Sequence, residues 1–141
     1  MKKVLLSVAA LATLFASCKK DDDNNKSRHD MLVGTWTVSQ FGTDINNNKV
    51  IDMGETSDSV MNGFFTFNAN GTAVASLSFM GMPADTSDAT WTLVDNDNYL
   101  RTISDGDTGY IMIQSISNNN LTLLDTTGAS MNAATWMVMS K

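Results

Sequence analysis

From residue 31 onward the chain alternates between short runs of apolar, aromatic and β-branched residues and short breaks rich in Asn, Asp and Gly. No stretch sustains the 3.6-residue period of an amphipathic helix, whereas several runs alternate with the two-residue period of a half-buried strand. The pattern therefore predicts an all-β domain. Eight strands are expected, at residues 32–41, 61–67, 72–80, 89–94, 99–104, 108–117, 120–124 and 134–140.

The breaks between the expected strands have turn-forming sequences. Asn70-Gly71 suits the positive φ of a tight hairpin, and the Asn and Asp residues at 95–98 and 118–120 favour left-handed and Asx turns. A further tight reversal fits Asp105-Gly106-Asp107. Strands joined by tight hairpins pair antiparallel with their chain neighbours, and eight of them can close without exposed edges. The sequence thus predicts an eight-stranded antiparallel up-and-down β-barrel.

One face of the expected strands is apolar and is predicted to line the barrel interior. Ala73 and Ala75 in the third strand are small enough to leave room on this face. That room is either a ligand cavity or space filled by large partners such as Phe65 and Phe67. If it is a cavity, the residues expected to contact an apolar ligand are Leu77, Phe79, Trp91, Ile111 and Met137.

The N-terminal segment is organised like a secretory signal. Two lysines precede an apolar run at residues 4–15, which is too short to span a membrane, and small residues stand directly before Cys18. The sequence Leu-Phe-Ala-Ser-Cys at 14–18 resembles the lipobox of bacterial lipoproteins, in which the Cys becomes the acylated first residue of the mature chain. The resemblance implies that residues 1–17 are removed and that Cys18 carries a membrane anchor.

Residues 18–30 are expected to form a flexible acidic tether, because Lys19-Lys20-Asp21-Asp22-Asp23 and the following polar residues are solvated and mutually repelling. This charge pattern also resembles the export signal of Bacteroidetes lipoproteins, which directs them to the cell surface. It implies an outer-membrane lipoprotein displayed at the surface. The alternative is a generic polar linker on a protein of the periplasmic face. The folded domain is expected at 31–141.

Two strands that carry Trp suggest a family. The first expected strand opens with Gly34-Thr35-Trp36, and the last contains Trp136. With the signal, the tether and the eight strands, this resembles the small lipocalin-like lipoproteins of the Bacteroidetes. The resemblance implies that Gly34 and Trp36 close one end of the barrel, under an Arg from the last strand. This chain departs from the family there, because its last strand has no Arg and only Lys141 follows it. It also implies a module, acting as a monomer, that binds a small apolar ligand.

Residues 44–55, between the first two expected strands, resemble the twelve-residue calcium loop of EF-hand proteins. Every ligand position holds an oxygen donor, as calcium requires. Lys49 occupies the position of the motif's Gly, where a side chain held at positive φ costs about 1 kcal/mol. A weak, structural calcium site is expected, and the alternative is a solvated Asn-rich loop. The expected ligands are Asp44, Asn46, Asn48, the Val50 carbonyl, Asp52 and Glu55.

Composition and charge exclude several functions. The 141 residues include one His and one Cys, and the net charge is −6 at pH 7. An acidic chain is a poor partner for nucleic acid. Because His29 falls in the expected tether and Cys18 is consumed by the lipid, the domain has no means to build a nucleophilic triad and is not expected to be an enzyme. The alternative to ligand binding is a structural or adhesion module, with a packed barrel, that contacts a protein or glycan.

Overall fold

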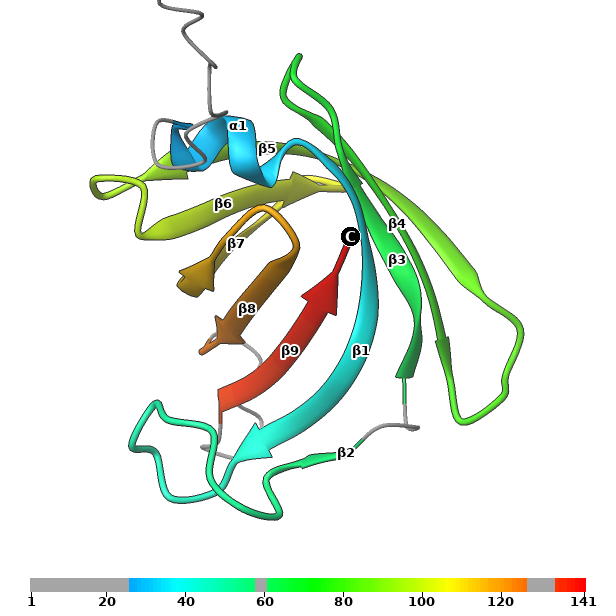
Figure 1. Ribbon diagram of the computed structural model, residues 1–141. Coiled ribbons are helices and arrows are strands. Elements are labelled where there is room, and N and C mark those ends of the chain that lie inside the picture. The colour runs from blue at the N-terminus through cyan, green and yellow to red at the C-terminus, as the bar shows by residue number, and fades with distance from the viewer. Residues whose placement is uncertain (1–25, 58–60, 127–133) are drawn as a thin grey trace, which may run out of the picture.

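The structure is a computed structural model that describes residues 26–57, 61–126 and 134–141 (Figure 1). The expected signal, Cys18 and most of the expected tether lie outside the described residues. One helix and nine strands occur in the described ranges, and none of the described helical residues forms a helix with the length and hydropathy to cross a bilayer. The elements are α1 Arg28–Leu32, β1 Gly34–Asp44, β2 Thr56–Ser57, β3 Met61–Phe67, β4 Thr72–Phe79, β5 Asp85–Val94, β6 Tyr99–Ser104, β7 Asp107–Ile116, β8 Asn120–Asp125 and β9 Ala134–Ser140.

The eight long strands form a closed antiparallel barrel. From β3 to β9 each strand pairs with the next along the chain, while β1 pairs with β3 on one side and with β9 on the other. The β1–β9 pairing runs from Thr37 opposite Ser140 to Asp44 opposite Ala134 and joins the first and last strands of the barrel. The two-residue β2 pairs antiparallel with Phe41 and Gly42 near the end of β1. The predicted eight-stranded antiparallel barrel is confirmed.

The turns follow the chemistry of their sequences. Gly71 has φ 83°, and Asp105 and Gly106 have φ 51° and 89°, as tight hairpins require. Three successive residues at 95–97 have φ between 53° and 64°, the left-handed conformation that Asn and Asp tolerate. These tight turns therefore pair the strands that they join antiparallel with each other.

The largest boundary differences concern α1 and β5, and β1 spans Gly34–Asp44 where residues 32–41 were expected. Residues 28–32 form helix α1 instead of extended chain, because Leu32 is fully buried at the barrel end and the Ser27 side chain accepts a hydrogen bond from the Asp30 N–H at 3.1 Å. The last part of the expected tether is thus helical, and its His29 ring stacks on Trp91 with centroids 5.0 Å apart. Strand β5, the fourth of the expected strands, begins at residue 85 rather than 89, because it pairs with β4 over that length.

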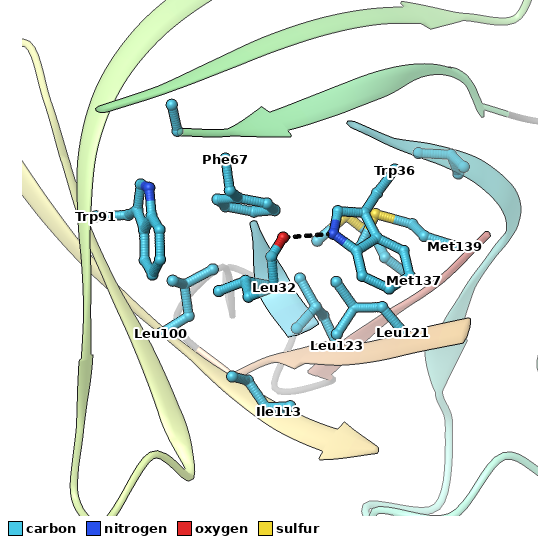
Figure 2. Close-up of a cluster of buried hydrophobic side chains, with 12 residues drawn as sticks. Leu32, Trp36, Phe67, Trp91, Leu100, Ile113, Leu121, Leu123, Met137 and Met139 are labelled. Atoms are coloured by element: carbon cyan, nitrogen blue, oxygen red, sulfur yellow. Dashed lines mark hydrogen bonds between the residues drawn. The ribbon is translucent and has the colours of Figure 1, made fainter. Parts of the chain in front are cut away.

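Side-chain contacts hold α1 against the barrel. The Arg28 guanidinium donates to the carbonyl of Asp97 at 2.9 Å and to the Asn98 Oδ1 at 3.3 Å, which ties the helix to the β5–β6 turn. The indole Nε1 of Trp36 donates to the Leu32 carbonyl at 2.7 Å, and both side chains are fully buried (Figure 2). The helix therefore closes this end of the barrel, which we call the closed end.

Lys141 completes the closed end. Its Nζ lies 4.4 Å from the centroid of the Trp36 ring and donates to the carbonyls of Met31 at 2.6 Å and Val33 at 2.7 Å. A Cβ at Gly34, which has φ 129°, would lie 3.1 Å from the Lys141 Cε, so Gly leaves room for this side chain. Desolvation, and secondly repulsion from Lys26, lowers the pKa of Lys141 below its ordinary value.

Replacing the charge while keeping an unbranched side chain tests this contact. We expect Lys141→Met to lower the free energy of unfolding by about 1–2 kcal/mol, since the cation–π contact and the donors to two carbonyls are lost from a partly hydrated site. Urea unfolding followed by Trp fluorescence measures the change. Lys26→Met removes a nearby exposed charge and is expected to change stability by less than about 0.5 kcal/mol. Equal losses in the two variants would contradict the assignment.

Candidate functional site

The barrel interior is not completely filled. A cavity of about 170 Å³ lies beside the core, and seven of the eight long strands, β3 to β9, contribute side chains to its wall. The space exists where Ala73 and Ala75 of β4 and Ala89 of β5 face inward. Phe65 and Phe67 line the cavity without filling it. The room expected at Ala73 and Ala75 is therefore present as a cavity.

Two of the five expected ligand contacts reach this cavity. Ile111 of β7 and Met137 of β9 are part of its wall. Leu77 packs against the core cluster beside the cavity and does not line it. The alternation along the strands thus placed these side chains inside the barrel, and the cavity occupies only part of that interior.

Trp91 and Phe79, the other expected contacts, lie at opposite ends of the barrel. Trp91 is 5% exposed, and its Nε1 donates to the carbonyls of Asn68 at 3.1 Å and Thr72 at 3.0 Å, so it packs over the β3–β4 turn at the closed end. Phe79 ends β4 and is 38% exposed, with its ring edge-to-face against Phe41 at 6.4 Å between centroids. Neither residue lines the cavity.

Sequence reasoning missed the polar part of the wall. Ser87 of β5 and Thr102 and Ser104 of β6 line the cavity together with the apolar residues. The Ser104 hydroxyl donates to the Asp88 carbonyl at 2.8 Å. Two-residue alternation from Leu100 could have identified Thr102 and Ser104, because all three share one face of β6.

The loop of residues 44–55 is organised around two buried carboxylates. Asp44, fully buried at the end of β1, accepts the backbone N–H of Asn48 at 3.2 Å and of Lys49 at 3.0 Å. Glu55, 6% exposed, accepts the N–H of Ile45 at 3.0 Å and of Asp52 at 2.9 Å. These bonds bring the two ends of the loop together.

The other expected calcium ligands lie in the same loop. The side-chain amides of Asn46 and Asn48 each donate to Asp52 Oδ2 at 2.8 Å, and the Val50 N–H donates to Asn48 Oδ1 at 2.7 Å. Lys49 has φ 60°, the conformation that the motif assigns to Gly. As they stand, no three His, Cys, Asp or Glu side chains among the described residues are grouped to hold a metal ion. The oxygen atoms expected to bind calcium thus lie in one loop, where they accept hydrogen bonds from N–H groups of the protein.

The connections from β1 to β2 and from β4 to β5 lie at the end of the barrel opposite α1 (Figure 1). Both carry exposed apolar side chains. We call this end the open end and these residues the apolar rim. Among the described residues, the other large exposed apolar side chains are only Phe64 and Tyr110. The apolar rim consists of Ile45, Val50, Ile51 and Met53 before β2, and Phe79, Met80 and Met82 at the β4–β5 turn.

Comparisons with known proteins agree with this architecture. A lipocalin-like protein from Bacteroides uniformis has 14% sequence identity and a TM-score of 0.55 over 79% of this chain and 98% of that chain. An uncharacterized protein from Bacteroides eggerthii has 14% identity and a TM-score of 0.51 over 78% of this chain and 98% of that chain. No curated protein matches the chain. The lipocalin-like domain profile matches residues 32–123, and the chain therefore belongs to the lipocalin-like domain family.

Proposed function

We propose that the protein is a membrane-anchored carrier, not an enzyme, that binds a small apolar molecule inside its barrel. The observation that carries this proposal is the cavity of about 170 Å³, whose described wall is mostly aliphatic and aromatic and includes no charged side chain. An apolar ligand would supply the packing contacts that the wall lacks. The volume is below the roughly 300–1,000 Å³ of pockets for drug-sized ligands, which limits the ligand to a small molecule.

Filling the cavity tests this proposal. We expect the protein to bind toluene saturably, because an apolar cavity of similar size accepts benzene-sized rings. Ala75→Leu should weaken binding at least tenfold, since the added carbons occupy the ligand's space. Ser76→Leu, at the next position on the opposite face of β4, is the matched control and should keep wild-type affinity. Isothermal titration calorimetry measures both.

The second candidate function is contact with a protein or glycan partner, and the apolar rim favours it because large exposed apolar patches often mark interaction sites. If toluene shows no saturable binding to the wild-type protein, the carrier proposal fails. The apolar rim then becomes the stronger functional surface.

The proposed anchor is an acylated Cys18 in the outer membrane, with the domain at the cell surface. The lipobox-like sequence and the acidic residues after Cys18 support this location. Eight residue steps separate Cys18 from Lys26, so the chain spans at most about 29 Å between them. This length keeps α1 and the closed end near the membrane. The open end would then face away from it, with the protein acting as a monomer.

Replacing the acceptor Cys tests the anchor. Cys18→Ala should move the protein from the membrane fraction to the soluble fraction of the producing cells, because no acyl chain can be attached. Intact-mass measurement of the wild-type protein should show removal of residues 1–17 and addition of lipid. An unmodified Cys18 in mature protein would contradict the proposal.

The loop of residues 44–55 is proposed to bind one calcium ion in a structural role. Support comes from the six oxygen-donor positions in EF-hand order and from the left-handed Lys49, which gives the loop the turn of that motif. Binding would replace the amide donors on Asp52 with the ion. The ion would neutralise the carboxylates of Asp44, Asp52 and Glu55.

Thermal unfolding with added ions tests the calcium site. For a dissociation constant of about 0.1–1 mM, 10 mM calcium should stabilise the fold by about 1–3 kcal/mol, which raises Tm by several degrees. Magnesium at the same concentration should raise Tm less than calcium does. Asp52→Asn should reduce the calcium shift, and Asp107→Asn, an exposed acid outside the loop, should preserve it. An unchanged Tm in calcium would leave residues 44–55 as a polar loop.

A further inference from the structure

The barrel wall is interrupted between β5 and β6. β5 pairs with β6 from Thr90, opposite Ile103, to Val94, opposite Tyr99. Residues 85–89 of β5 pair with β4 alone. β6 ends at Ser104, where the turn at Asp105-Gly106 leads back into β7. We call the resulting gap, between the first half of β5 and the β6–β7 turn, the side notch.

The polar residues of the cavity lie at this side notch. Ser87 stands on the half of β5 that pairs with β4 alone and is exposed, and Ser104 is the last residue of β6. Thr102 lies one inward-facing position deeper on β6. Because the Ser104 hydroxyl donates its proton to the Asp88 carbonyl, its oxygen is left to accept a bond from a ligand.

The outer surface is hollowed at the same place. A groove on the outside of the barrel shares four residues with the wall of the inner cavity, namely Ala73, Val74, Ala89 and Ser104. Only small and medium-sized residues therefore separate the two spaces. The wall away from the notch is aliphatic and aromatic. The cavity therefore has a polar end at the side notch and an apolar base.

Charge at the side notch restricts the head group of a ligand. The charged residues among those that line the groove are Asp88 and Asp105, and the described wall of the cavity adds no Lys or Arg. A carboxylate placed there would lose hydration without gaining a cationic partner and would be repelled by both acids. A neutral hydroxyl or carbonyl group can instead exchange hydrogen bonds with the serine and threonine hydroxyls. An ammonium would also lose hydration there, because the described wall of the cavity carries no carboxylate to pair with it.

We infer that the cavity binds a neutral amphiphile, such as a short-chain alcohol or ketone, and discriminates against carboxylates of the same chain length. The head group lies at the side notch, bonded to Thr102 and Ser104, and the hydrocarbon tail lies along the apolar base against Phe65, Ile111 and Met137. The inference rests on the proposed function, because it requires that the barrel interior bind a ligand.

Three six-carbon probes test the head group at pH 7.5. We expect the wild-type protein to bind 1-hexanol at least tenfold more tightly than hexanoate and also more tightly than hexylammonium, as measured by calorimetry. Thr102→Val removes the hydroxyl and keeps the side-chain shape, and it should weaken 1-hexanol binding about three- to tenfold while leaving toluene binding unchanged. Thr108→Val, at an exposed position outside the cavity, should change neither.

The outcomes separate this inference from the proposed function. Absence of toluene binding to the wild-type protein would overturn the carrier function and this inference with it. Toluene binding combined with equal affinity for 1-hexanol and hexanoate would overturn only the head-group assignment. Tighter binding of hexylammonium, or 1-hexanol affinity unaffected by Thr102→Val, would overturn it as well. Equal losses of toluene and 1-hexanol binding in Thr102→Val would reduce Thr102 to a structural role and also overturn the assignment.

Discussion

Pairing of β1 with β9 is the constraint on which the rest of the structure depends. It joins residues about 100 positions apart in the sequence and closes the wall that encloses the cavity. It also brings Lys141, directly after β9, over the Trp36 ring at the start of β1. The same strand pairing therefore closes the barrel wall and positions the side chains that cover the closed end. Pairing two such distant segments costs chain entropy, because a long loop must be closed. Contacts of the strands between them offset this cost only once those strands have formed.

Most of the barrel could be predicted because its signals are local. Two-residue alternation marks the strands, and Gly71 and Gly106 occupy the left-handed positions that their turn sequences require. Helix α1 could not be predicted in the same way, because five residues are too few to show helical periodicity. It forms through tertiary contacts, chiefly burial of Leu32 and the bond from Trp36 to its carbonyl. The family match then confirmed the lipocalin-like resemblance.

The cavity was only partly predictable. Alternation identifies which face of a strand looks inward, and Ile111 and Met137 line the cavity. It does not give the height of a residue along the barrel axis, which depends on the stagger between strands. Trp91 is therefore found at the closed end and Phe79 at the open end. Thr102 was not predicted to line the cavity, because a single hydroxyl side chain in a strand gives no sequence signal for an apolar site.

Helix α1 also has a mechanical consequence. It is the first described element after the N-terminal segment, and it is attached to the barrel by a few side-chain contacts, among them Arg28 to Asp97 and Trp36 to Leu32. A pulling force on the N-terminal segment would load these contacts one after another, whereas the paired strands share a load across many hydrogen bonds. Short elements of this kind are the first to open locally. Under tension, the helix would therefore detach and unfold before the barrel strands separate.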